Sequence, residues 1–411
     1  MRASDRICLQ PVSFPTATSP FAATGLSSMC RCAPQSDRNR ARALSPRGAD
    51  MFKVLIQPKW TLHAADGRPL PPKLIDLLLG VHATGSLAAA CRDLDLSYRY
   101  AWGLLQSSRS LFGAPLLRMT RGRGATLTAL GESLVWADQR IAARLAPTLD
   151  SLASEVEVEL GRVLSAQAAP PRLHAAHGFA VETLRRFLDE ADVAVDLKYR
   201  SPGEALAALR SGDCDLAGVH LPIGEFERDI LSHYADRIDP AGDRALHLAT
   251  RRIGLIVAPG NPKRIRTLAD LLREDVRFIH RQHGSGARLL LERMLAKQGH
   301  SIRDVRGCGI DELTHAAVAA YVASGMADAG FGLETPARRY GLEFLPIASE
   351  HYFFLVREQT LTAPALAEVM AILHSERFRH ELGLLPGYDA GRCGTVQDLF
   401  EAFPSARAVF A

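Results

Sequence analysis

Residues 85–102 read GSLAAACRDLDLSYRYAW, and residues 115–128 read PLLRMTRGRGATLT. The first stretch predicts a short helix, a tight turn and a second helix, because Ser86 and Ser97 stand where an N-cap residue is favoured. The second stretch predicts a hairpin, since two alternating segments flank a tip that contains Gly and Arg. This is the layout of a winged helix-turn-helix, which predicts a module that binds DNA.

The local charge of this region supports the same prediction. The net charge of the 411 residues is only +4, which is too small to indicate a nucleic-acid partner by itself. Residues 97–124 contain no Asp or Glu, and they contain the basic residues Arg99, Arg109, Arg118, Arg121 and Arg123. A basic patch on one small module is typical of phosphate binding.

The candidate DNA-binding residues lie at the start of the second helix and on the hairpin. They are Ser97, Tyr98, Arg99, Tyr100, Arg118, Arg121 and Arg123. Arg99 suits a guanine or a phosphate, and arginines at the hairpin tip suit the minor groove or phosphates. Alternatively, the hairpin tip is only a solvent-exposed turn. Tyr100 and Trp102 could also be aromatic residues of the hydrophobic core, and we favour this interpretation for Trp102.

The remaining composition excludes several function classes. Seven scattered cysteines show no zinc-site spacing and fit a reducing cytoplasm. No apolar run approaches the roughly 20 residues that span a bilayer. The sequence contains no Gly-x-Ser-x-Gly elbow, no Walker sequence and no helical His-Glu metal motif. We therefore expect a cytoplasmic protein that is neither an enzyme nor a membrane protein and has no metal or cofactor.

The chain divides into five predicted segments. Residues 1–50 lack periodicity and are either a disordered arm or an upstream extension, with Met51 as the credible start. Residues 51–130 form the DNA-binding module, beginning with a strand over 51–62. Residues 131–168 form a linker and dimerisation element, since apolar residues from Leu130 to Leu160 recur at helical spacing. Pro147 should kink this helix or divide it in two. A ligand-binding domain (169–390) and a C-terminal tail (391–411) follow.

Strands and helices alternate after residue 172, which predicts a parallel α/β fold. About 220 residues are many for one sheet, so two lobes with a cleft between them are expected. The predicted strands are 173–176, 193–199, 215–221, 254–258, 277–280, 327–331, 344–347 and 353–356. The predicted helices are 181–188, 206–211, 267–272, 287–298 and 314–324.

Several polar residues stand where strands end and helices begin. A helix N-terminus offers unpaired N–H groups and a partial positive charge, so these positions predict an anion site. The candidate ligand-binding residues are His177, Gly178, His220, Arg281, Ser285, Gly286, Arg288, Thr314 and His315. Each has a structural alternative: Ser285 as an N-cap only, the arginines as surface ion pairs, and the histidines as structural residues. Asp328 is expected to hold a strand end, and Glu350 with Tyr352 to form a hinge between lobes.

Residues 84–90 (TGSLAAA), 96–102 (LSYRYAW) and 115–118 (PLLR) resemble the N-terminal domain of ModE-type molybdate-responsive regulators, relatives of LysR-type regulators. The resemblance covers roughly residues 51–150. It implies a homodimer that binds a palindromic operator in double-stranded DNA, with half-sites about one helical turn apart.

The rest of the chain departs from ModE proteins, which end in small β-barrel domains. Residues 217–221 (AGVHL), 281–288 (RQHGSGAR), 325–330 (GMADAG) and 350–352 (EHY) resemble instead a periplasmic-binding-protein-like domain of two lobes, type II. The family usually has Thr where this chain has Ala287, which removes one hydroxyl donor. The resemblance implies molybdate or tungstate as effector, whereas the residues suit sulfate or a small organic acid equally. The alternative function is a small-molecule-binding or molybdenum-cofactor-pathway protein with a vestigial DNA module.

Overall fold

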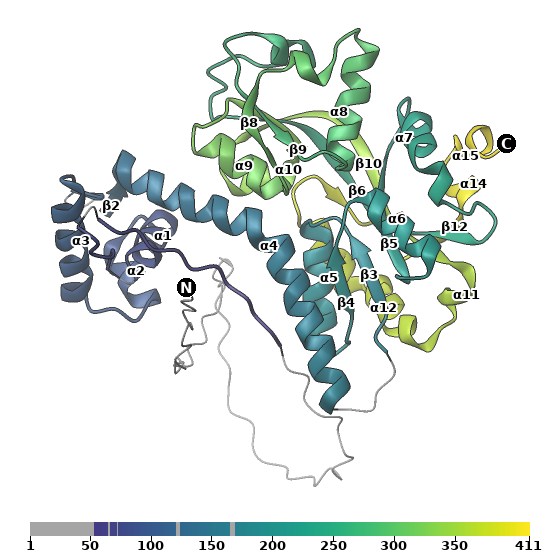
Figure 1. Ribbon diagram of the computed structural model, residues 1–411, viewed down its shortest axis with the longest axis horizontal. Coiled ribbons are helices and arrows are strands. Elements are labelled where there is room, and N and C mark those ends of the chain that lie inside the picture. The colour runs from purple at the N-terminus through teal and green to yellow at the C-terminus, as the bar shows by residue number, and fades with distance from the viewer. Residues whose placement is uncertain (1–52, 65, 72, 121–123, 165–168) are drawn as a thin grey trace, which may run out of the picture. The chain divides into compact units, whose positions relative to one another are not determined.

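The computed structural model describes residues 53–64, 66–71, 73–120, 124–164 and 169–411. Residues 1–50 and the hairpin-tip residues Arg121 and Arg123 therefore lie outside the described residues. The first module contains three helices and an antiparallel hairpin at the positions expected from the sequence (Figure 1). Its elements are α1 (Leu74–Thr84), α2 (Leu87–Asp93), α3 (Tyr98–Phe112), β1 (Leu117–Thr120) and β2 (Gly124–Leu127).

One glycine and two serines set the helix boundaries in this module. Gly85 ends α1 in the left-handed region at φ 65°, where glycine carries no steric penalty. The Ser86 hydroxyl accepts the Ala89 N–H, and the Ser97 hydroxyl accepts the Tyr100 N–H. Each serine satisfies a donor that the first turn of α2 or α3 would otherwise leave unpaired.

The strand predicted for residues 51–62 is absent over the described part, 53–62. These residues are extended but lie against a helix rather than beside another strand. The Val54 N–H donates to Glu157 Oε1 at 2.8 Å, and the Trp60 indole N–H donates to Asp138 Oδ1 at 2.8 Å. The alternating apolar residues therefore correctly indicated a half-buried extended segment. They did not indicate that this segment would contact a helix instead of another strand.

The linker element is one continuous helix, α4 (Ala129–Leu164), with Pro147 inside it. Of the two outcomes predicted at Pro147, the division into two helices is therefore wrong. Proline has no N–H, so the carbonyl of Ala143 loses its helical partner. The Thr314 hydroxyl donates to that carbonyl at 3.1 Å, and this outside donor replaces the missing intrahelical bond.

Ten strands of the C-terminal domain form one sheet. They are β3 (Arg172–Ala175), β4 (Asp196–Tyr199), β5 (Leu216–Pro222), β6 (Asp243–Val257), β7 (Phe278–Arg281), β8 (Gly307–Glu312), β9 (Ala329–Leu333), β10 (Glu343–Arg357), β11 (Tyr388–Asp389) and β12 (Val396–Asp398). The α-helices are α5 (Phe179–Glu190), α6 (Pro202–Ser211), α7 (Glu227–Tyr234), α8 (Gly286–Lys297), α9 (His315–Ala323), α10 (Glu334–Arg339), α11 (Glu358–Leu361), α12 (Pro364–His374), α13 (Glu376–Gly383), α14 (Leu399–Ala402) and α15 (Ala406–Val409). Short 3-10 helices are η1 (Ala235–Arg237), η2 (Leu268–Leu272) and η3 (Ile302–Asp304).

The sheet is mixed, which corrects the expected all-parallel arrangement. Its order is β4-β3-β5-β10-β6-β9-β7-β8, with β11 and β12 both paired to β6. The outer strands pair in parallel, whereas β6 and β10 run antiparallel to each other and to their neighbours. The predicted strands 344–347 and 353–356 are two parts of β10, which is interrupted only by local bulges.

Two long strands connect two lobes. β6 and β10 are 15 residues each, and one half of each strand lies in each lobe. The first lobe contains β3, β4 and β5 with α5 and α6, and the second contains β7, β8 and β9 with α8 and α9 (Figure 1). The expected two-lobed architecture is confirmed, and it places a cleft beside the middle of β6 and β10.

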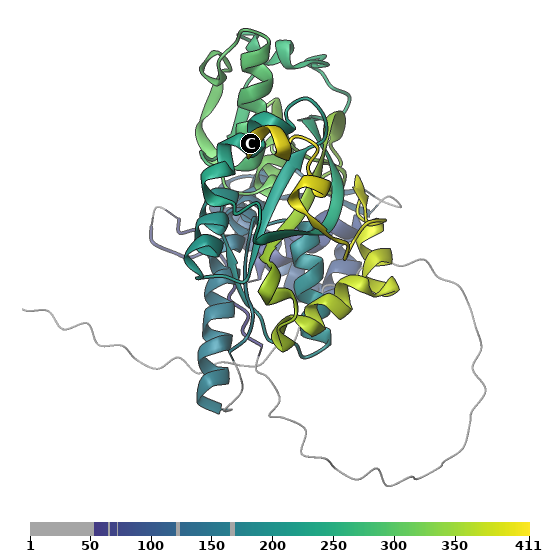
Figure 2. The same ribbon diagram turned by 90° about the vertical axis from the view of Figure 1, so that its right-hand side faces the viewer.

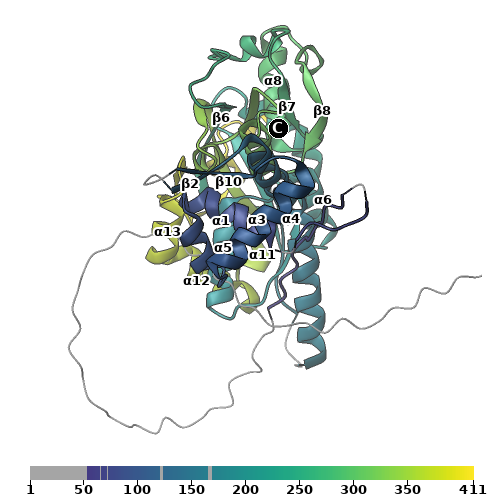
Figure 3. The same ribbon diagram turned by 90° about the vertical axis from the view of Figure 1, so that its left-hand side faces the viewer.

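The C-terminal residues complete the first lobe. α12 and α13 pack against α5 (Figure 3), and α14 packs against β6 and β12 (Figure 2). Leu399 and Phe403 are buried among side chains of α6, α7 and β5. Residues 391–411 are therefore part of the ligand-binding domain and not the separate tail expected from the sequence.

Two helical glycines in the first module are expected to respond oppositely to alanine. A Cβ on Gly131 of α4 would lie 2.3 Å from the Leu116 carbonyl oxygen, whereas a Cβ on Gly103 of α3 would meet no atom within 4 Å. Gly131→Ala should lower the free energy of unfolding by about 1–3 kcal/mol through overpacking. Gly103→Ala should raise it by about 0.5–1 kcal/mol through helix propensity. Urea denaturation of both variants tests this, and equal shifts would contradict it.

Candidate ligand-binding cleft

A cavity of about 440 Å³ lies between the two lobes, within the usual size range of small-molecule sites. The first lobe contributes His177, Tyr199 and His220, and the second contributes Arg281, Gln282, Ser285, Gly286 and His315. Arg251 of β6 lines it between the lobes, and Pro147, Thr148, Ser151, Leu152 and Glu155 of α4 form a further wall. Six of the nine predicted ligand-binding residues therefore meet in one cavity.

Arg281, at the end of β7, carries a buried charge with few partners. It is 8% exposed, and its Nη2 donates to the Leu313 carbonyl at 2.8 Å. Its Nε and Nη1 have no hydrogen-bond partner among the described residues. Burial, followed by the nearby positive charge of Arg251, lowers the pKa of Arg281 to about 10. The side chain remains charged at neutral pH, so an anion in the cavity would satisfy both its charge and its free donors.

Arg251 was not predicted from the sequence, although it is the other buried cation of the site. It lies opposite Glu350 in the register of β6 and β10, and its Nη2 is 2.6 Å from Glu350 Oε1. Its guanidinium lies 4.8 Å from the centroid of the Tyr352 ring. Burial opposes its charged form, but Glu350 together with the nearby Tyr388 and Tyr352 outweighs burial and raises the pKa of Arg251. The sequence feature that could have indicated a role for Arg251 was the presence of a charged residue inside an otherwise largely apolar strand.

Two buried histidines add neutral polar groups to the cavity. Burial, followed by Arg251 and Arg281, holds the pKa of His220 well below its usual range. Burial and the same two arginines do the same for His315. Both rings are therefore neutral at pH 7, and the Nδ1 atom of each lacks a partner among the described residues. Each ring can offer one nitrogen to a ligand, as donor or acceptor according to its tautomer.

Glycines allow the histidine rings to approach the backbone closely. A Cβ on Gly286 would lie 3.2 Å from His220 Cδ2, and a Cβ on Gly332 would lie 3.0 Å from His315 Nδ1. Gly286 is also the first residue of α8, whose N-cap Ser285 accepts the Arg288 N–H. The cavity therefore receives the N-terminus of a 12-residue helix, where unpaired N–H groups favour an anion.

Two further polar atoms in the cavity were not predicted. The Tyr199 hydroxyl and Gln282 Oε1 are buried without hydrogen-bond partners among the described residues. Burial raises the pKa of Tyr199 well above its ordinary value, so the hydroxyl remains protonated. The ring of Tyr199 contacts His177, with centroids 4.6 Å apart. Together with Arg281 and the two histidines, these groups form a set of unsatisfied donors and acceptors around one space.

Three predicted ligand-binding residues do not line the cavity. Gly178 is the N-cap residue of α5, and Thr314 caps α9 and binds Ala143 of α4. The Arg288 guanidinium is held by Glu292 and Asp311, at 3.0 and 2.8 Å, and donates to the carbonyl of Arg281. For Arg288 the alternative of a structural ion pair is the one that the geometry supports, because carboxylates already satisfy its charge.

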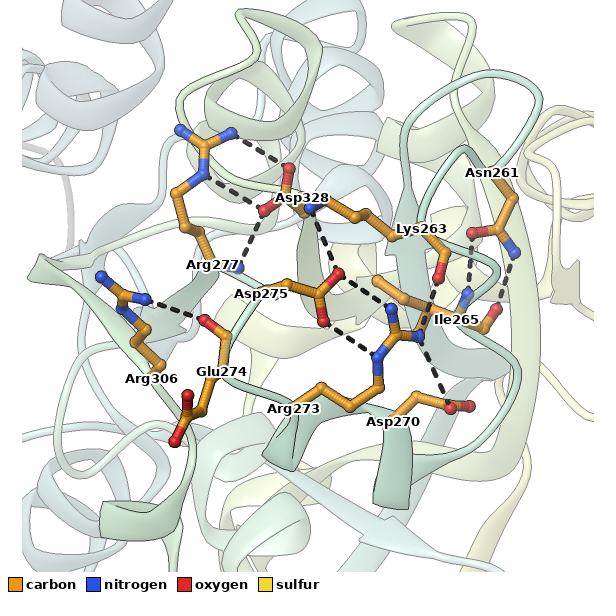
Figure 4. Close-up of polar contacts among 10 residues, drawn as sticks. All are labelled: Asn261, Lys263, Ile265, Asp270, Arg273, Glu274, Asp275, Arg277, Arg306 and Asp328. Atoms are coloured by element: carbon orange, nitrogen blue, oxygen red, sulfur yellow. Dashed lines mark hydrogen bonds and ion pairs between the residues drawn. The ribbon is translucent and has the colours of Figure 1, made fainter.

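A separate polar network stabilises the second lobe away from the cavity (Figure 4). Arg277, just before β7, donates to both carboxylate oxygens of Asp328 and to the carbonyls of Gly325 and Met326. Asp328 also accepts the Arg277 backbone N–H at 2.8 Å. Asp328 thus holds the start of β7, consistent with the strand-end role expected for it.

The described candidate DNA-binding residues form an exposed surface on the first module. Tyr98 and Tyr100 are 50% and 47% exposed, and Arg99 and Arg118 are exposed as well. Trp102 is 42% exposed, so the favoured interpretation of Trp102 as a core aromatic is wrong. Ser97 is exposed and caps α3. Arg121 and Arg123 lie outside the described residues.

Comparison with known proteins identifies the C-terminal domain. The family model of the PBP superfamily domain matches residues 185–374. YvgK of Bacillus subtilis (strain 168), an uncharacterized protein, is 35% identical over 225 residues, covering 53% of this chain and 70% of YvgK. The chain belongs to the YvgK family.

Two further similarities are more distant. The molybdenum-pterin-binding protein MopB of Rhodobacter capsulatus is 30% identical over 178 residues, covering 38% of this chain and 66% of MopB. The solved structure of CbnR, a LysR family transcriptional regulator, is 18% identical and covers 73% of this chain and 96% of its own, with a TM-score of 0.33. No helix in the described part of the chain is long and apolar enough to cross a membrane. The same residues contain no group of His, Cys, Asp and Glu arranged to hold a metal ion.

The buried histidines predict that stability falls in mild acid. The pKa values of His220 and His315 are lowered in the folded state, so below about pH 6.5 the unfolded chain binds protons that the folded chain cannot. The free energy of unfolding should therefore decrease as the pH falls from 7.5 to 5.5. His220→Gln should make this decrease smaller, and His283→Gln, at an exposed position, is the matched control. Urea denaturation at both pH values measures the slopes, and identical slopes for the two variants would contradict the assignment.

Proposed function

We propose that this protein is a transcription regulator whose PBP-like domain binds a small anion between its lobes. The single observation that carries the proposal is the buried guanidinium of Arg281, which has two nitrogens without partners and lines a cavity. A buried cation without a carboxylate partner is costly unless an anion neutralises it. The neutral histidines and the N-terminus of α8 support the same ligand class.

Molybdate or tungstate is the proposed effector. The support is the resemblance to ModE-type regulators and the similarity to a protein described as molybdenum-pterin-binding. Sulfate and small organic acids suit the same donors and serve as the competing ligands in the test. The cavity offers hydrogen-bond donors and positive charge, and we propose binding rather than catalysis as its role.

We assign operator binding to the first module. α3 presents exposed Tyr98, Arg99 and Tyr100 at its N-terminal end, the part of a recognition helix that contacts base edges. The proposal also includes a homodimer formed through α4. Leu145, Leu152, Val156 and Leu160 of this helix are exposed at spacings of seven, four and four residues, which suits pairing with a second copy of the helix.

The anion site is tested by isothermal titration of the full chain with sodium molybdate, tungstate and sulfate. Arg281→Gln should weaken binding of the preferred anion by about 30-fold or more, as when one partner of a buried charge pair is removed. Arg228→Gln is the matched control, because Arg228 is exposed on α7. Equal affinities for wild type and Arg281→Gln would refute the assignment of Arg281. If none of the three anions binds, the same titration is repeated with small organic acids.

DNA binding is tested by selecting a site from a random duplex library and measuring affinity by fluorescence anisotropy at fixed salt. Arg99→Ala should weaken binding to the selected site by about 5- to 150-fold, the range for one base-contacting arginine. Arg109→Ala makes the same change of charge ten residues further along α3 and should have a smaller effect, since it lies about 15 Å away along the axis. The alternative function, a binding protein with a vestigial DNA module, predicts no selectable site at all.

A further inference from the structure

The linker helix α4 is attached to the first lobe through two serines. The Ser154 hydroxyl donates to the Val195 carbonyl at 3.2 Å and accepts the Leu197 N–H at 2.8 Å. The Ser151 hydroxyl accepts the Tyr199 N–H at 3.0 Å. Because β4 is the outermost strand of the sheet, these hydroxyls occupy backbone groups that another strand would otherwise pair. Ser154 is 1% exposed, so this attachment is dry and specific.

An earlier part of the same helix is attached to the second lobe. The Thr314 hydroxyl donates to the Ala143 carbonyl at 3.1 Å, which is the carbonyl left without a helical donor by Pro147. Arg144 Nη1 lies 3.8 Å from Glu312 Oε1. Nearer the N-terminus of α4, the rings of Trp136 and Tyr340 lie 5.8 Å apart. The Arg140 guanidinium also lies 5.5 Å from the centroid of the Tyr321 ring. This attachment contains one hydrogen bond, whereas the serines form three with β4.

From Pro147 to Glu155, the part of α4 that follows Ala143 and includes the two serines, the helix forms one wall of the cavity. Pro147, Thr148, Ser151, Leu152 and Glu155 line it, and their spacing places them on one side of the helix. Thr314, which binds Ala143, is also adjacent in sequence to His315, and His315 lines the same cavity. A ligand in the cavity would therefore contact α4 and the two lobes at the same time.

We propose that α4 holds the two lobes apart in the ligand-free protein, and that ligand binding breaks the Thr314–Ala143 hydrogen bond. This inference rests on the proposed function, because it assumes that the lobes close on a ligand. A helix has a fixed rise per residue, so its two attachment points cannot follow lobes that move toward each other. The attachment to the second lobe is the one that yields, since it has fewer hydrogen bonds. The helix that leads directly to the DNA-binding module then changes its contacts.

Loss of the Thr314–Ala143 hydrogen bond should raise the affinity of the protein for its ligand. Closure must break the Thr314–Ala143 bond, so removing that bond in advance should tighten ligand binding by about 2- to 10-fold, the value of one hydrogen bond. Pro147→Ala supplies a helical N–H that competes for the Ala143 carbonyl and leaves the Thr314 cap intact. Thr314→Val removes the donor together with the cap, and Thr314→Ser keeps both and is the matched control. If Thr314 has only a structural role, Thr314→Val should bind the ligand with the same affinity as wild type or more weakly.

The experiment combines hydrogen exchange and titration on the full chain. Without ligand, Thr314→Val should accelerate amide exchange in residues 138–147 at least about fivefold and leave residues 151–158 unchanged, while Thr314→Ser behaves as wild type. With sodium molybdate, tungstate or sulfate as the probe, the wild type should show the same acceleration in 138–147. Pro147→Ala should bind the active probe more tightly than wild type.

The outcomes separate this inference from the proposed function. Unchanged exchange in ligand-free Thr314→Val would overturn the attachment of α4 to the second lobe, whatever the ligand is. A probe that binds without altering exchange in 138–147, and with equal affinity for Pro147→Ala and wild type, would overturn the breaking of the bond. Failure of every probe to bind would count against the effector named under the proposed function, and the ligand-free arm would still decide whether α4 holds the second lobe.

Discussion

The antiparallel pairing of β6 with β10 is the constraint on which the rest of the ligand-binding domain depends. Both strands pass from one lobe to the other, and Arg251 and Glu350 face each other where the lobes meet. Both side chains are 3% exposed and share a contact of 2.6 Å. Removing one partner of such a buried pair typically costs about 3–5 kcal/mol, because the other charge is left uncompensated. The pair lies where the register of β6 and β10 brings residues of both lobes to one cavity.

The electrostatics of the cavity follow from which charges are already neutralised. Glu350 compensates Arg251, and carboxylates of the second lobe compensate Arg288, but Arg281 retains free donors. Burial, reinforced by the positive charge of the two arginines, keeps His220 and His315 uncharged. A buried cation with free donors beside neutral histidines is an arrangement suited to a small anion that also carries hydrogen-bonding groups.

The sequence predicted α4 as a linker and dimerisation element, and the structure shows that it is also a wall of the cavity. It follows the first module directly in the chain, and its serines, its proline and the Ala143 carbonyl connect it to both lobes. Communication between sites requires a physical element that both sites bias. In the proposed function this element is α4, a single helix that lines the cavity and has an exposed apolar stripe on its surface.

The sequence by itself determined features that depend on neighbours in the chain. Ser86, Gly85 and Ser97 set helix boundaries through local hydrogen bonds and backbone preference, and apolar alternation located most strands of the two lobes. The position of Arg281 and Ser285 between a strand and a helix was likewise sufficient to place both in the cavity. The strand over residues 51–62 failed as a prediction because periodicity describes burial, but not the partner that causes it.

Only the tertiary structure decided which charged groups meet. Arg251 joins the site because β10 places Glu350 opposite it, about one hundred residues later in the chain, and Arg288 leaves the site because Asp311 lies within reach. Pro147 remains inside a helix because Thr314 arrives from another element to satisfy Ala143. Such pairings depend on distances between segments remote in sequence, and no local pattern of residues contains those distances.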